Sequence, residues 1–177
     1  MSNGTTSTSG STGGTGPGPG GSVQSPLTLL IPMQENAIYD LRKNLQKLQD
    51  QLAHGLDQIG IVHFVRLLIL PNTNILAIIT TYDGSFDDYI QAFVRNPIVA
   101  ATFDTFLKVT DDVNTPPSLP TGPQMVPVQK NADIFVKYLN FYDYTNVDRR
   151  DSFAWYSAYP TMTVKQIVAC SKTPSGS

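Results

Sequence analysis

The longest apolar stretch of the chain covers residues 60–83 and is interrupted once, at residues 71–74. Val, Ile, Leu and Phe dominate both halves, while Pro, Asn and Gly stand only at their ends. This pattern predicts two β-strands joined by a tight turn. The hairpin is the centre around which the other elements are arranged.

A turn over residues 71–74 fixes the register of this hairpin. Side chains alternate between the two faces of a strand, and both faces of the first strand are apolar. Neither face can therefore be left to water, and helices can cover only one of them. A second sheet, a subunit interface or the proline-rich segment of residues 110–130 must cover the other. The expected opposing pairs are Leu70 with Ile75, Leu67 with Ile78, Val65 with Thr80, His63 with Tyr82 and Val62 with Asp83.

The other periodic segments complete an α+β pattern. Apolar residues recur every three or four positions from Gln34 to a predicted helix end at His54–Gly55. Ser85 is a predicted N-cap, and Asn96–Pro97 ends one helix and begins the next. The remaining predictions are strands over residues 27–33 and 152–159, a helix over residues 131–141, and a terminal helix that begins at Thr161 or Thr163.

The first six elements match the split βαβ plan, which predicts a ferredoxin-like α+β domain. Its antiparallel sheet would have the strand order 4-1-3-2, with helices on one face. Two such sheets meeting face to face, as in a dimeric α+β barrel, would bury the second face. A homodimer is therefore expected.

Composition divides the chain into one domain and two tails. Residues 1–22 are almost wholly Ser, Thr, Gly and Pro, so a disordered tail is expected over residues 1–26. The domain is expected over residues 27–170, with a second disordered tail at 171–177. No secretory leader is expected, because residues 1–26 lack an apolar core and a basic start.

Charge and cysteine content limit the classes of partner. A net charge of −2 gives no electrostatic reason to expect nucleic acid or an anionic membrane, and no run is apolar enough for a membrane span. Cys170 is the only cysteine, which excludes an internal disulfide and a thiolate metal cluster. The expected compartment is the cytoplasm.

Four segments, LTLLIPM, VHFVRLLIL, ITTYDGSFDDYIQAF and FAWYSAYPTMTVKQI, occur in this order. Together they resemble ferredoxin-like α+β proteins related to the dimeric α+β barrels and associated with haem peroxidases. The resemblance spans residues 27–170 outside the proline-rich segment, and it implies the fold more than any reaction.

Dye-decolourising peroxidases share that architecture and carry a Gly-x-x-Asp-Gly motif whose Asp lies over the haem. Asp83 and Gly84 match this motif, whereas Thr80 replaces its first glycine. Those enzymes bind the haem iron through a histidine in their C-terminal half. This chain has no histidine after His63.

Three polar residues of the hairpin are candidate catalytic groups. His63 could be an axial ligand, a general base or a ligand anchor, or else a strand histidine that stacks on Tyr82. Arg66 lies in an apolar strand and must pair with a carboxylate, for which Asp83 is the candidate, or bind an anionic ligand. Asp83 could instead cap the turn before the next helix.

Aromatic residues are the candidate ligand-binding groups. Tyr82, Trp155 and Tyr156 could line a pocket for a flat ligand, although aromatic strands also build ordinary cores. Two functions remain open: a peroxidase-related protein that binds a small apolar or aromatic ligand, haem included, and a non-catalytic assembly module. No metal site is expected.

Overall fold

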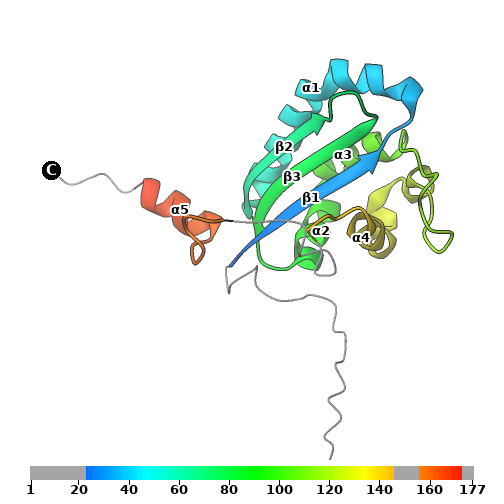
Figure 1. The fold of residues 1–177 in the computed structure, drawn as a ribbon. Coiled ribbons are helices and arrows are strands. Elements are labelled where there is room, and N and C mark those ends of the chain that lie inside the picture. The colour runs from blue at the N-terminus through cyan, green and yellow to red at the C-terminus, as the bar shows by residue number, and fades with distance from the viewer. Residues whose placement is uncertain (1–22, 146–155, 173–177) are drawn as a thin grey trace, which may run out of the picture.

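The computed structural model describes residues 23–145 and 156–172 (Figure 1). The predicted N-terminal tail up to residue 22, Trp155 and residues 173–177 lie outside these ranges. The chain is a mixed α+β protein, as predicted. The elements are β1 (Gln24–Pro32), α1 (Glu35–Ile59), β2 (Val62–Ile69), β3 (Ile75–Asp83), α2 (Phe86–Arg95), α3 (Pro97–Leu107), the short 3-10 helices η2 (Gly122–Met125) and η3 (Val128–Lys130), α4 (Ala132–Phe141) and α5 (Val164–Ser171).

The described strands form one antiparallel sheet in the order β1-β3-β2. The predicted hairpin register is confirmed from Ile69, which faces Leu76, to Phe64, which faces Thr81. It fails beyond Phe64, where a β-bulge makes His63 an extra residue and places Val62 opposite Tyr82. The four-stranded order and the barrel are not established by these strands.

Helices α1, α2, α3 and α4 lie on one face of the sheet (Figure 1). That face is the core, because alternate side chains of the strands are almost completely buried against the helices. A chain of aromatic rings continues the core away from the sheet, beginning with Tyr82 stacked on Tyr89 at a centroid distance of 3.8 Å. The sheet contributes Leu27, Leu29 and Ile31 of β1, Leu67 of β2, and Leu76, Ile78 and Tyr82 of β3.

The opposite face, called here the open face, bears Leu30 on β1, Phe64, Arg66 and Leu68 on β2, and Ile79 on β3. Phe64 is 51% exposed, and Leu30, Leu68 and Ile79 are half-buried. Among the described helices, α1 to α4 lie on the other side and α5 stands apart from the sheet (Figure 1). The prediction that a second sheet or a subunit interface covers this face stays a prediction, because the described part of one chain leaves the face uncovered.

The proline-rich segment packs on the helix side, so it does not cover the open face. Met125 and Val128 are fully buried in the same core as α3 and α4. The carboxylate of Asp112 holds the segment together because it accepts hydrogen bonds from several donors. These donors are the Thr110 and Thr115 hydroxyls, the Gly122 amide and, at 2.8 Å, the Tyr138 hydroxyl.

Both edges of the sheet have polar partners. Residues 142–145 run beside β1, where the Leu30 amide donates to the Tyr142 carbonyl and the Tyr144 amide donates to the Thr28 carbonyl. The Gln49 side chain of α1 accepts from the Leu67 amide of β2. Such contacts protect edges that would otherwise recruit further strands.

The predicted strand over residues 152–159 is wrong for its described part. Residues 156–159 are not in a strand, because the Ser157 hydroxyl accepts from the Tyr159 amide and bends the chain locally. Residues 152–155 lie outside the described ranges.

The predicted end of the first helix is also wrong. α1 continues through Gly55 to Ile59, and Gly60 takes the left-handed C-cap conformation with φ 68°. Gly55 is required for packing instead, since a Cβ built there would lie 2.6 Å from Cγ2 of Val99 on α3.

Candidate functional site

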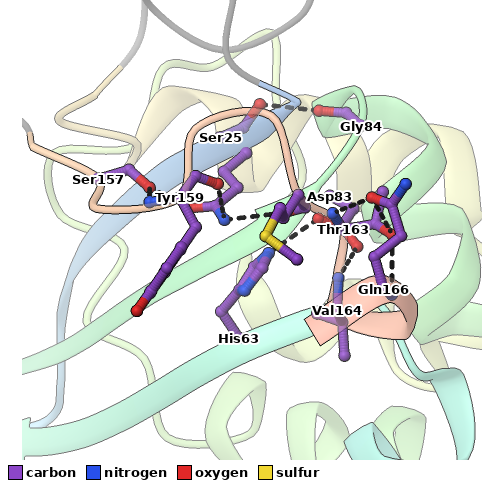
Figure 2. Close-up of polar contacts among 11 residues, drawn as sticks. Ser25, His63, Asp83, Gly84, Ser157, Tyr159, Thr163, Val164 and Gln166 are labelled. Carbon is purple, nitrogen blue, oxygen red and sulfur yellow. Dashed lines mark hydrogen bonds and ion pairs between the residues drawn. The ribbon is translucent and has the colours of Figure 1, made fainter. Parts of the chain in front are cut away.

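His63 and Asp83 of the hairpin lie together at the end of the open face where β3 finishes (Figure 2). His63 lies in the bulge of β2, and its Nε2 is 2.8 Å from Oδ1 of Asp83. Their side chains are only 13% and 12% exposed. A carboxylate that holds one imidazole nitrogen fixes the ring orientation and leaves the other nitrogen for proton transfer or ligation.

Asp83 also holds the start of α5. Its second oxygen, Oδ2, accepts a hydrogen bond of 2.8 Å from the Val164 amide, the first residue of that helix. A negative charge is favourable at a helix N-terminus, where the backbone amides have no helical partners. Thr163 completes the cap, because its hydroxyl accepts from the Gln166 amide. Both oxygens of Asp83 are therefore engaged within the chain.

Gln24 holds the segment that precedes α5 against the same end of the sheet. Its side-chain amide donates to the carbonyls of Tyr159 and Met162 and accepts from the Ser157 hydroxyl (Figure 2). Gln24 is paired with Asp83 across β1 and β3, so both side chains point to the open face. The segment of residues 157–163 thus covers one end of the open face and leads into α5.

Arg66 does not join this cluster, so the predicted pair of Arg66 and Asp83 is wrong. The Arg66 side chain is exposed and forms no hydrogen bond or ion pair with any described residue. The bulge explains the difference, because the additional residue at His63 brings the imidazole to Asp83 first. Arg66 remains the charged residue in the middle of the open face.

The predicted aromatic residues do not meet in the described structure. Tyr82 points into the helix-covered core and is 3% exposed, whereas Tyr156 is 86% exposed on the surface. Burial raises the pKa of the Tyr82 hydroxyl well above its ordinary value. Trp155 lies outside the described residues, so its place in a ligand site stays a prediction.

The residues at this site do not fit haem of the peroxidase type. Such a site needs an aspartate oxygen free above the haem, whereas both oxygens of Asp83 accept hydrogen bonds from the chain. The sequence holds two histidines: His54 is exposed on α1, and His63 keeps only Nδ1 for ligation because its Nε2 is bonded to Asp83. Within the described ranges there is also no group of three or more His, Cys, Asp and Glu residues that could hold a metal ion.

Sequence analysis missed Gln24 and the attachment of α5 to Asp83, whereas the terminal helix itself, with its start at Thr163, is confirmed. A polar residue just before an apolar strand was the only local signal for Gln24. Its partners lie more than 130 positions away in the sequence, so no periodic pattern connects them.

Comparison with protein-family models, curated proteins and solved structures gives no match for this chain. None of the helices in the described ranges has the length and apolar character needed to cross a membrane. The functional argument therefore rests on the geometry of the site and of the open face.

Proposed function

We propose that this protein is a non-catalytic assembly module that forms a homodimer through its open face. The observation that carries the proposal is the apolar open face itself. Leu30, Phe64, Leu68 and Ile79 remain half-buried or exposed there, and no described helix covers them. Apolar side chains left uncovered on one face of a folded domain, here around the exposed Arg66, are typical of an interaction surface.

The His63–Asp83 pair supports this proposal better than it supports catalysis. Both oxygens of Asp83 are used to orient His63 and to hold α5, which are structural tasks. The pair is also nearly buried, whereas an acid or base must reach its substrate. The cluster thus fixes the border of the open face.

Leu68→Asp tests the proposal. Leu68 points to the open face, so the variant places a charge in the proposed interface without disturbing the helix-covered core. The dimer dissociation constant should rise at least about tenfold, which corresponds to about 1.4 kcal/mol. Sedimentation velocity measures the change, and circular dichroism confirms the fold.

Tyr39→Asp is the matched control for this experiment. Tyr39 is 73% exposed on α1, away from the open face, and receives the same new carboxylate. Its dissociation constant should equal that of the unmodified chain. Equal dimerisation of the Leu68→Asp variant and this control would refute the proposed interface.

A small apolar or aromatic ligand is the second candidate occupant of the open face. Two observations favour it: the Asp83 carboxylate orients His63 at one end of the open face, and the exposed Arg66 lies in the middle of that face. The probe 1-anilinonaphthalene-8-sulfonate offers an aromatic body and an anionic group to these residues. Saturable fluorescence enhancement that is lost in Arg66→Met would support this function, and unchanged enhancement in that variant would exclude Arg66 from it.

The free thiol of Cys170 is exposed, which suits a reducing compartment. We therefore keep the cytoplasm as the proposed location.

A further inference from the structure

The C-terminal arm, defined here as residues 156–172, is attached to the sheet mainly through hydrogen bonds. None of its side chains is buried, and Met162, Val164 and Ile167 are only half-buried. Burial of apolar side chains is the main force that offsets the loss of chain entropy on folding, and the arm contributes little of it. Hydrogen bonds to the sheet replace hydrogen bonds to water, so each adds only a small net stability. The arm is therefore held more weakly than the helix-covered core.

The described contacts attach the arm at two points on the end of the sheet. At the first point, Gln24 of β1 forms three hydrogen bonds to the segment before α5. The neighbouring Val23 amide donates to the Pro160 carbonyl. At the second point, Asp83 of β3 accepts from the Val164 amide. All of these bonds join polar groups, and water can replace either partner.

Local hydrogen bonds hold the arm itself together. The Tyr159 amide donates to the Ser157 hydroxyl, and the Met162 amide donates to the Tyr159 carbonyl. Thr163 and Gln166 then form a reciprocal capping box at the start of α5. These partners are two or three residues apart, so their bonds remain when the contacts to the sheet are lost. The arm can therefore leave the sheet as a unit.

Polar side chains of the sheet are covered where the arm is attached. Gln24 is 5% exposed, and the side chains of His63 and Asp83 are nearly buried. Figure 2 shows His63 and Asp83 among the arm residues Tyr159 and Val164. Helices α1 to α4 lie on the other side of the sheet (Figure 1). Detachment of the arm would therefore bring these polar groups into contact with water.

From the weak attachment, the internal bonds and the covered side chains, we infer that the arm is a latch: it detaches as one unit and uncovers the His63–Asp83 pair. In the attached state both oxygens of Asp83 accept hydrogen bonds from the chain. In the detached state Oδ2 of Asp83 and the amide of Gln24 become available to an external ligand. The latch thus controls access to this end of the open face. It operates within one chain, so the inference does not depend on the proposed homodimer.

The first test is hydrogen exchange in a Gln24→Ala variant of the full-length chain. This change removes the contacts of the first attachment point but leaves the bond between Asp83 and the Val164 amide untouched. If the arm detaches as one unit, the Val164 amide should nevertheless exchange at least about tenfold faster. The Leu67 amide, which Gln49 holds at the opposite edge of the sheet, is the internal reference and should keep its rate.

Ser157→Ala weakens the latch from the side of the arm and leaves every residue of the sheet unchanged. It removes one of the three bonds to Gln24, so the Val164 amide should exchange at least about twofold faster. Gln51→Ala, on the exposed side of α1, is the control and should not change this rate. The fold is not at risk in Ser157→Ala, because Ser157 is not buried.

The two histidines of the chain supply the second test. Diethyl pyrocarbonate modifies accessible imidazoles, and mass spectrometry of the two histidine-containing peptides measures each rate. His54 is exposed on α1 and serves as the reference, whereas His63 is nearly buried. In Gln24→Ala and in Ser157→Ala, the modification rate of His63 relative to His54 should rise by the same factor as the exchange rate of the Val164 amide, because one opening event limits both.

Parallel increases at Val164 and His63, equal at low and high protein concentration, support the latch. Faster exchange over residues 157–162 with an unchanged Val164 amide would show that the arm opens in parts, which overturns the inference. Faster exchange at Val164 with unchanged modification of His63 would show that the arm does not cover the pair, and it overturns the inference as well. If Gln24→Ala accelerates the Leu67 amide by the same factor, the whole sheet is destabilised, and the result for Ser157→Ala decides.

Discussion

Asp83 is the residue on which both the His63 side chain and the start of α5 depend. One oxygen of its carboxylate contacts the imidazole, and the other accepts from the Val164 amide. Sequence reasoning marked Asp83 through its likeness to a peroxidase motif. The structure assigns it a positional task instead, which connects β2, β3 and α5.

Asp83→Ala should loosen α5 and weaken the fold. The loss of hydrogen bonds to a charged group lowers the free energy of unfolding by about 1.5–3 kcal/mol. Hydrogen exchange should become at least about tenfold faster at the first amides of α5, because their anchor is gone. His63→Ala is the control, since it removes one partner of Asp83 but leaves the bond to Val164. Equal exchange in α5 for Asp83→Ala and the unmodified chain would contradict the anchoring.

The buried tyrosines predict how stability depends on alkaline pH. Burial raises the pKa of the Tyr82 and Tyr89 hydroxyls above their ordinary values. Below about pH 10 both the folded and the unfolded chain keep these protons. Above it the unfolded chain loses protons that the folded chain retains, so the free energy of unfolding falls by about 1.4 kcal/mol per pH unit for each tyrosine.

Tyr82→Phe should therefore make this fall less steep, as measured by urea unfolding at several alkaline pH values. Tyr39→Phe changes an exposed hydroxyl and should leave the slope unaltered. An identical slope for Tyr82→Phe and the unmodified chain would show that Tyr82 titrates alike in both states.

At the scale of elements, sequence analysis predicts well those segments in which the apolar residues follow a single period. The hairpin register from Phe64 to Ile69 followed from alternation and turn length, which leave no other arrangement of the apolar faces. The N-cap at Ser85 and the boundary between two helices at Asn96–Pro97 were predicted correctly because their signals are local. These elements required no knowledge of distant contacts.

The errors come from distant contacts. A one-residue bulge at His63 hardly changes the apolar alternation, so nothing local reveals it. Gly55 resembles a helix end in sequence, whereas the structure requires a glycine there because α3 lies too close for a side chain. The exposure of α5 and of the open face could not be read from the chain, since an apolar pattern does not say what covers it.

Gly55→Ala tests the packing of α1 against α3. Alanine favours the helix by about 1 kcal/mol, but overpacking of a rigid core costs about 1–3 kcal/mol. Val99 is fully buried and β-branched, so its methyl group cannot move aside easily. The net result should be a lower free energy of unfolding in urea. Gln51→Ala, on the exposed side of the same helix, should not lower it, and a stabilising Gly55→Ala would contradict the close approach.

At the scale of the whole molecule, one cause explains both the open face and the exposed helix α5. The helices and the proline-rich segment all pack on one side of the sheet, so a single described chain buries only that side. The apolar residues on both faces of the hairpin require cover for the second side as well. The proposed homodimer would supply the missing cover for the sheet.

Sedimentation equilibrium of the unmodified full-length chain tests this account most directly. Over a wide range of protein concentration, the account predicts a reversible equilibrium between one chain and two. The mass should settle at twice that of the chain when concentrated, with no larger species, because contact between two open faces leaves no such face for a third chain. A constant mass of one chain at every concentration, with the apolar face still exposed, would contradict the account.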